Sequence, residues 1–155
     1  MKNNSISFII LLIFISLISC NGDKDKLFTS LSHKRTGIDF INFIKDSETF
    51  NVLDYGYFYN GGGVAVGDIN NDGLPDIYFS GNLTTSKLYL NKGNLKFEDM
   101  TNKANVTSGG TWNTGVTMAD INGDGFPDIY VCSSTDARPE HRKNLLFINN
   151  GDLTF

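Results

Sequence analysis

The sequence contains few cysteines, and this scarcity excludes a fold that depends on disulfide bonds. Only Cys20 and Cys132 occur among the 155 residues. Small disulfide-stabilised domains need several cysteine pairs. The folded chain must instead rely on a hydrophobic core, and a composition of 40% hydrophobic residues with 16 glycines provides for one globular core of modest size.

Positive charge and catalytic motifs are scarce as well. The net charge of −4 offers no broad basic surface for phosphates, so we expect no nucleic-acid partner. The sequence has no G-x-S-x-G, no phosphate-binding G-x-x-x-x-G-K-[ST] and no H-E-x-x-H motif. Its two histidines, His33 and His141, lie in polar segments typical of solvated loops. The sequence therefore predicts a protein that is not an enzyme.

The single long apolar stretch lies at the N-terminus. It follows Lys2, covers residues 8–15 and extends through residue 18, which is shorter than the roughly 20 residues of a membrane-spanning helix. The stretch ends in Leu17-Ile18-Ser19-Cys20, which resembles the lipobox of bacterial lipoproteins, where the cysteine is acylated and becomes the new N-terminus.

This resemblance implies an exported protein at the outer membrane or cell surface. Residues 1–19 would form the signal peptide, Cys20 would be the lipidation site, and residues 20–27 would form a flexible tether. The partner at this end of the chain would be the membrane, reached through the lipid anchor. The alternative is an ordinary cleaved signal peptide with an incidental cysteine, which would give a secreted or periplasmic protein.

An internal repeat dominates the remainder of the chain. Residues 63–79 (GVAVGDINNDGLPDIYF) align without a gap to residues 115–131 (GVTMADINGDGFPDIYV), with 11 identities in 17 positions. Further on, LYLNKGNLKF at 88–97 matches LFINNGDLTF at 146–155 at five of ten positions. We therefore expect two structural units, residues 57–107 and residues 108–155, preceded by a segment 28–56 that could contribute a strand.

Each unit has the pattern of four short strands. Val64 and Val66 alternate with small residues, as do Val116 and Met118, which indicates strands with one apolar face. Turns such as NKGN and NNGD favour hairpins, with glycine at positive φ. Four strands per unit of 50 to 60 residues is typical of a propeller blade. The predicted fold class is all-β, with β-propeller blades that are incomplete in this chain.

Both units carry an acidic loop of the form D-x-N-x-D-G-x-x-D. Side chains at its positions 1, 3, 5 and 9 can turn inward, the carbonyl at position 7 can join them, and the glycine makes the turn. Such a set contains only oxygen atoms, which favours Ca²⁺ over zinc or copper, so we expect two structural Ca²⁺ sites. The predicted ligands are Asp68, Asn70, Asp72, Leu74 and Asp76 in the first loop and Asp120, Asn122, Asp124, Phe126 and Asp128 in the second.

Two other interpretations of these loops compete with this ligand assignment. An EF-hand would need a glutamate at position 12, where the chain has Phe79 and Val131, and it would need flanking helices. Asx-rich turns that merely cap hairpins are the second alternative. Two loops in register with a repeat of strands favour the metal sites.

The segments 61–82 and 114–134 resemble the FG-GAP or VCBS repeats of integrin-α-type β-propellers, in which a calcium loop lies between two strands of a blade. Together with the lipobox, they resemble large Gram-negative lipoproteins that often end in an ASPIC/UnbV domain. The Phe-Gly and Gly-Ala-Pro signatures are missing, which favours the VCBS variant. Because a closed propeller takes typically four to eight blades, we expect an N-terminal fragment whose second blade is truncated and whose open edges make it marginally stable.

The resemblance implies a cell-surface binding or scaffold module with a protein or glycan ligand. The alternative is the substrate-presenting part of a larger secreted enzyme that acts on glycans or other polymers. A set of aromatic residues is expected either to pack between blades or to stack on sugars; it consists of Tyr55, Tyr57, Phe58, Tyr59 and Trp112.

Overall fold

A computed structural model describes residues 26–134 and 142–155. The chain divides into two units, Met1–Leu31 and Ser32–Phe155. The described part of the first unit, residues 26–31, forms neither helix nor strand. The expected signal peptide and Cys20 lie outside the described residues. Within the described ranges, no helix is both long and apolar enough to cross a bilayer.

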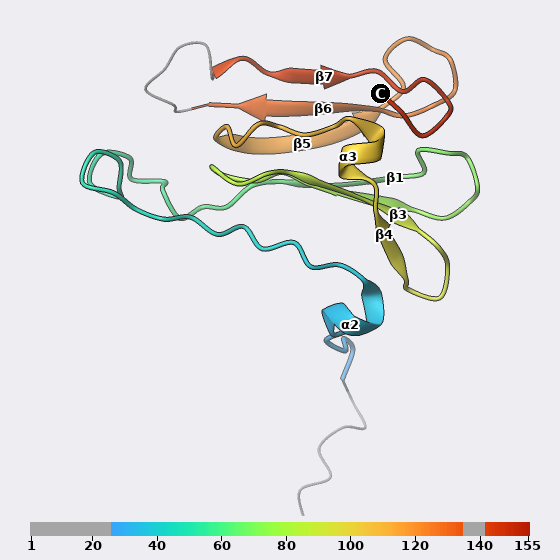
Figure 1. Cartoon of the computed structure of the whole chain (residues 1–155), viewed down its shortest axis with the longest axis horizontal. Coiled ribbons are helices and arrows are strands. Elements are labelled where there is room, and N and C mark those ends of the chain that lie inside the picture. Colours follow the sequence, from blue (N-terminus) through green and yellow to red (C-terminus); the bar gives the residue numbers. More distant parts are fainter. Residues whose placement is uncertain (1–25, 135–141) are drawn as a thin grey trace, which may run out of the picture. The chain divides into compact units, whose positions relative to one another are not determined.

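The second unit contains two antiparallel β-sheets (Figure 1). The first sheet has the order β1-β2-β3-β4, and the second has the order β5-β6-β7. The only α-helices in the described parts of this unit have four residues each, α2 (His33–Thr36) and α3 (Thr101–Ala104). This architecture confirms the all-β class, with no closed propeller. The strands are β1 (Val64–Gly67), β2 (Asp76–Phe79), β3 (Lys87–Asn91), β4 (Phe97–Asp99), β5 (Asn113–Ala119), β6 (Asp128–Ser133) and β7 (Leu145–Phe147).

The two copies of the sequence repeat pair their strands in the same register. Gly67 faces Asp76 at the end of the β1–β2 pair, and Ala119 faces Asp128 at the end of the β5–β6 pair. Both acidic loops therefore leave the first strand and enter the second at equivalent points. The third strands also correspond, because Tyr89 faces Ile77 in the first sheet and Phe147 faces Ile129 in the second.

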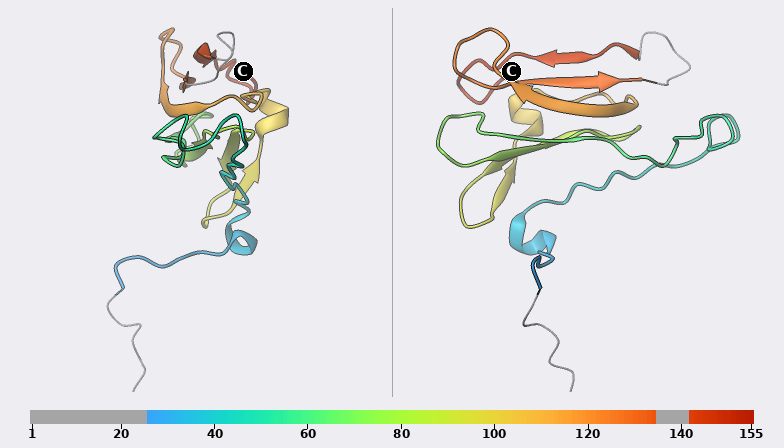
Figure 2. Two further views of the ribbon diagram at one scale, coloured as in Figure 1. Left: turned by 90° about the vertical axis from the view of Figure 1, so that its left-hand side faces the viewer. Right: turned by 180° about the vertical axis from the view of Figure 1, so that it is seen from behind.

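A shared hydrophobic core lies between the sheets, which stack as two layers (Figures 1 and 2). The first sheet contributes Tyr78 and Leu88, and the second contributes Ile129 and Val131, all fully buried. The hydroxyl of Tyr78 donates to the carbonyl of Val106 over 3.0 Å. Burial raises the pKa of Tyr78 to about 12. Partly buried side chains complete the core, namely Val116, Met118, Leu145, Phe147, Leu153 and Phe155.

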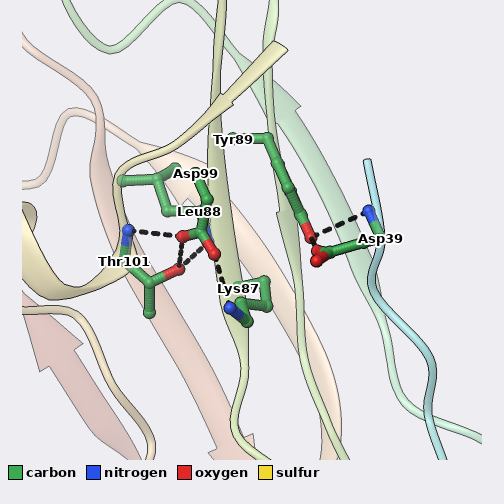
Figure 3. Close-up of polar contacts among 6 residues, drawn as sticks. All are labelled: Asp39, Lys87, Leu88, Tyr89, Asp99 and Thr101. Atoms are coloured by element: carbon green, nitrogen blue, oxygen red, sulfur yellow. Dashed lines mark hydrogen bonds and ion pairs between the residues drawn. The ribbon is translucent and has the colours of Figure 1, made fainter. Parts of the chain in front are cut away.

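A polar contact connects the last strand of the first sheet to α3. The hydroxyl of Thr101 donates to Asp99 over 2.6 Å and accepts the backbone N–H of Leu88 over 3.0 Å (Figure 3). The Asp99 carboxylate also pairs with Lys87. Burial alone would raise the pKa of Asp99, but the hydrogen bonds from Lys87 and Thr101 outweigh it and lower that pKa below its ordinary value.

The segment before the repeats covers part of the outer face of the first sheet. The ring of Phe40 stacks on Phe79 with centroids 5.1 Å apart. Asp39 accepts the hydroxyl of Tyr89 over 2.6 Å (Figure 3). The strand register places Phe79 and Tyr89 on the face opposite Tyr78 and the core. Residues 28–56 contain no strand; they include α2 and an isolated bridge between Ser47 and Phe50.

A network of asparagine side chains joins this segment to the residues that follow β2 and to the start of β5. The side-chain nitrogen of Asn42 donates to Asn82 over 2.7 Å, and that of Asn82 donates to the carbonyl of Asn113 over 2.7 Å. Asn113 in turn donates to the carbonyl of Gly81 over 2.9 Å. In the described part of the chain, no buried side-chain nitrogen or oxygen lacks a hydrogen-bond partner. The network thus fixes the two sheets relative to each other without an unsatisfied polar group.

Candidate metal centres

The two acidic loops lie next to each other at one end of the sheets. The first acidic loop (residues 68–76) connects β1 to β2, and the second acidic loop (residues 120–128) connects β5 to β6, on the right in Figure 1. The side chain of Asn71 in the first loop donates to the carbonyl of Gly125 in the second over 3.0 Å. The glycines at position 6, Gly73 and Gly125, have φ of 84° and 91°. Such left-handed backbone favours glycine, which explains the residue at this position.

In the first loop, the backbone N–H groups turn toward the acidic side chains. Asp68 accepts the N–H of Asp72 over 3.1 Å and that of Gly73 over 2.7 Å. Asp72 accepts the N–H of Leu74 over 2.8 Å. The side-chain nitrogen of Asn70 donates to Asp72 over 2.9 Å. These bonds close the loop into a compact turn, so the carboxylates at positions 1 and 5 also shape the backbone.

The second loop repeats these bonds at equivalent positions. Asp120 accepts the N–H of Asp124 over 3.1 Å and that of Gly125 over 2.8 Å. Asp124 accepts the N–H of Phe126 over 2.9 Å and the side-chain N–H of Asn122 over 2.7 Å. The two loops therefore adopt one local structure, although their sequences differ at several positions.

The aspartate at position 9 is buried and holds the loop against the third strand. Asp76 accepts the N–H of Ile69 over 2.9 Å and that of Asn91 over 2.7 Å. Asp128 accepts the N–H of Ile121 over 2.9 Å and that of Asn149 over 2.8 Å. Both carboxylates are fully buried. Asp76 therefore joins the start of its loop to the last residue of β3, and Asp128 joins the start of its loop to a residue just beyond β7.

Burial raises the pKa of Asp76 above its ordinary value. The backbone N–H groups of Asn91 and Ile69 oppose this rise, and the negative charges of Asp72 and Asp68 add to it. The three carboxylates of the first loop are therefore near enough to repel one another. A cation between them would relieve this repulsion.

As they stand, the loops do not form a closed metal cage. Within residues 26–134 and 142–155, no three His, Cys, Asp or Glu side chains lie close enough together to hold a metal ion. In each loop the asparagine nitrogen, which cannot bind a cation, is bonded to the position-5 carboxylate. The structure brings the predicted ligands into one loop but does not converge three carboxylates on a point.

The chemistry of the donor set nevertheless fits a hard cation. Every predicted ligand in both loops offers oxygen, from carboxylates, an amide or a main-chain carbonyl. A carboxylate has about four lone-pair sites, and the N–H groups that bond to Asp68 and Asp72 occupy only some of them. Oxygen ligands in a flexible loop suit Ca²⁺. An EF-hand does not fit, because Phe79 and Val131 lie in strands β2 and β6.

Two asparagines that the sequence interpretation missed support these loops. The side chain of Asn91 donates to the carbonyl of Pro75 over 2.9 Å, and that of Asn149 donates to the carbonyl of Pro127 over 3.1 Å. Asn149 also donates to the carbonyl of Ile69 in the first loop over 2.8 Å. The sequence repeat contained a signal for both, because Asn91 and Asn149 occupy the same position of the aligned segments LYLN and LFIN.

The aromatic set lies at the opposite end of the sheets from the acidic loops. Trp112 is buried and contacts the rings of Phe50, Tyr55 and Phe58, with centroids 5.3 to 5.7 Å apart. Its packing partners come from the segment before β1. Tyr57 and Tyr59 are exposed.

Residues 68–131 match the FG-GAP-like repeat family. The match begins at the first acidic loop and ends within β6, so it includes both acidic loops. A repeat of this family fits a propeller blade, in agreement with the antiparallel sheets described above. No curated protein matches the sequence.

Proposed function

We propose that the chain is an exported, lipid-anchored module of a calcium-binding β-propeller, and that it serves as a binding or scaffold domain at the cell surface. The observation that carries this proposal is the pair of acidic loops. They share one set of hydrogen bonds, lie side by side and contain only oxygen ligands. The match to the FG-GAP-like repeat supports the propeller context.

Calcium would have a structural role in this proposal. The cation would supply positive charge to loops that carry three carboxylates each. Residues of the chain would hold the loops in place. Asp76 and Asp128 bond to the N–H groups of Asn91 and Asn149, and Gly73 and Gly125 permit the turn. The module would then present its loops and surfaces to a partner without chemistry of its own.

The anchor is the second part of the proposal. The segment Leu17-Ile18-Ser19-Cys20 supports acylation at Cys20 and a place at the outer membrane. Metabolic labelling with an alkyne fatty acid should mark the wild type and fail to mark Cys20→Ser. A labelled Cys20→Ser protein would contradict lipidation at this residue.

Calcium titration with thermal melting tests the central proposal. A ligand that binds only the folded state must stabilise it. We expect the melting temperature to rise with Ca²⁺ and to fall with chelator, and we expect Mg²⁺ at equal concentration to have a smaller effect because it demands stricter octahedral geometry. A melting temperature indifferent to both Ca²⁺ and chelator would overturn the structural-metal assignment.

A further inference from the structure

The end of the sheets opposite the acidic loops contains a pocket that the metal sites leave unexplained. Its volume is about 280 Å³, and two parts of the chain far apart in sequence form it. One part precedes β1, and the other lies at the start of β5. The lining residues are Tyr55, Tyr57, Asn60, Gly61, Gly62, Trp112 and Thr114.

The aromatic walls of this pocket are held in place by packing. Trp112 and Tyr55 meet edge to face with centroids 5.7 Å apart, and Tyr55 and Tyr57 meet in the same way at 5.8 Å. Trp112 is 2% exposed, whereas Tyr57 is 65% exposed. The buried tryptophan packs against Tyr55, and most of the Tyr57 side chain is open to solvent. An exposed aromatic ring can serve as a platform on which a ligand stacks.

Two of the lining residues are glycines at positions that other residues fit poorly. A Cβ atom at Gly62 would lie 1.9 Å from the carbonyl oxygen of Ser80, so the backbone packs closely there against the residue that follows β2. Gly61 has φ of 76°, which favours glycine.

The polar groups that the described part of the chain contributes to the pocket are neutral. None of the described lining residues is Asp, Glu, Lys, Arg or His. No hydrogen bond joins the carboxamide of Asn60 or the hydroxyls of Tyr55 and Tyr57 to another residue in the described part of the chain. The hydroxyl of Thr114 donates weakly to the carbonyl of Cys132 over 3.4 Å. The ligand that suits this lining is neutral and rich in hydroxyl groups, because an anion would need a cationic partner.

We infer that this pocket binds one ring of a neutral saccharide, with Tyr57 as the stacking platform and Asn60 as the polar contact. A pyranose ring has a face of C–H groups with partial positive charge, which suits the negative face of an aromatic ring. Its hydroxyls can bond to the amide and hydroxyl groups of the rim. The inference rests on the proposed binding role and names its ligand class, but it does not depend on the calcium assignment.

The test uses Trp112, the single tryptophan of the chain. The full chain is titrated in calcium buffer with cellohexaose, mannohexaose and maltohexaose up to about 10 mM, a range suited to weak binding. We expect a saturable change of tryptophan emission with at least one of them, matched by heat in isothermal titration calorimetry. Trigalacturonate, which is anionic, should bind less tightly than the neutral oligomer.

Variants assign the binding to the pocket. Tyr57→Ala should weaken it about tenfold, because the stacking platform is lost. Tyr59→Ala is the matched control, since Tyr59 is also 65% exposed but does not line the pocket. Asn60→Asp, a surface change that should not disturb folding, should also weaken binding by placing a charge beside the neutral ligand. Thermal melts of each variant establish that it is folded.

Three results would overturn the inference: no neutral oligomer binds, Tyr59→Ala weakens binding as much as Tyr57→Ala, or trigalacturonate binds more tightly. A calcium melt on the same preparation separates this failure from that of the proposed function. If Ca²⁺ stabilises the chain but no saccharide binds, the calcium assignment stands and the saccharide inference is wrong. If a saccharide binds but Ca²⁺ has no effect on stability, the saccharide inference stands and the calcium assignment is wrong.

Discussion

The side-chain nitrogen of Asn149 donates to the main-chain carbonyl of Ile69 over 2.8 Å, across 80 positions of sequence. The backbone N–H of the same Asn149 donates to Asp128, and the N–H of Ile69 donates to Asp76. A buried path of hydrogen bonds thus runs from the position-9 aspartate of one acidic loop to that of the other. The first loop is held in part by the second sheet.

This path predicts a large loss of stability in Asn149→Ala. The substitution leaves the carbonyls of Ile69 and Pro127 without their donor, and unsatisfied buried groups cost about 1–3 kcal/mol each. We expect the free energy of unfolding in urea to fall by about 2–4 kcal/mol. Asn150→Ala is the control, because Asn150 is exposed and bonds only to Thr154. Equal effects of the two substitutions would contradict the path.

Removing one carboxylate from each acidic loop should separate the two calcium sites. Each site, at a hundredfold excess of Ca²⁺ over its Kd, would stabilise the fold by about 2.7 kcal/mol. Asp72→Ala and Asp124→Ala should each lose about that amount of the calcium-dependent stability, and the double variant should lose nearly all of it. Calcium titration followed by urea unfolding measures this.

The control for the loop variants is Glu48→Gln, an exposed acidic residue outside both loops. It should retain the full response to Ca²⁺. If Asp72→Ala and Asp124→Ala respond to Ca²⁺ as strongly as the wild type does, the cation binds elsewhere or not at all.

Asp99 should make stability depend on pH in the acid range. Because the pKa of Asp99 is lowered in the folded state, its contribution is present above the ordinary value of 3.8 and is lost as pH falls through the lower folded pKa. The pair with Lys87 is about one-third exposed, so the effect should be about 1 kcal/mol or less. We expect Asp99→Asn to lose stability at pH 7 and to approach the wild type below pH 3.8. Urea unfolding at several pH values measures the difference, and a constant difference would refute the role of Asp99.

Gly37→Ala should weaken the contact between the segment after α2 and the first sheet. Gly37 has φ of 82°, and an added Cβ would lie 2.3 Å from the carbonyl oxygen of Phe97. Strained backbone costs of order 1–3 kcal/mol, and the clash adds to it. Hydrogen exchange over residues 38–44 should accelerate. Gly56→Ala is the control, because nothing lies within 4 Å of its added Cβ; acceleration in both variants would argue against a specific contact at Gly37.

The repeated part of the fold could be predicted from local sequence. Alternation at Val64 and Val66, and the paired aspartates with glycine at position 6, indicate strands and loops because both depend on residues close together in the chain. The structure confirms strands on both sides of each loop. In β1, however, the side chains of Val64 and Val66 are exposed, and Ala65 between them is the buried residue. Whether the loops bind a metal stays a prediction.

Contacts between distant residues were beyond the reach of those patterns. Asn42, Asn82 and Asn113 form one network, yet nothing in the sequence around any of them indicates a partner 31 or 40 positions away. Trp112 finds its partners some 50 to 60 positions earlier, in a segment with no periodicity. Such contacts depend on how the sheets stack, and the local alternation of residues along one strand does not specify that.

Residues 38–44 cover part of the outer face of the first sheet, and this affects the order in which the chain can fold. Those residues leave the ribosome before the strands they cover. Phe79 and Tyr89 can therefore find Phe40 and Asp39 as soon as β2 and β3 emerge. The chain can then fold in order from its N-terminus, because the second sheet packs on a first sheet whose outer face is already covered.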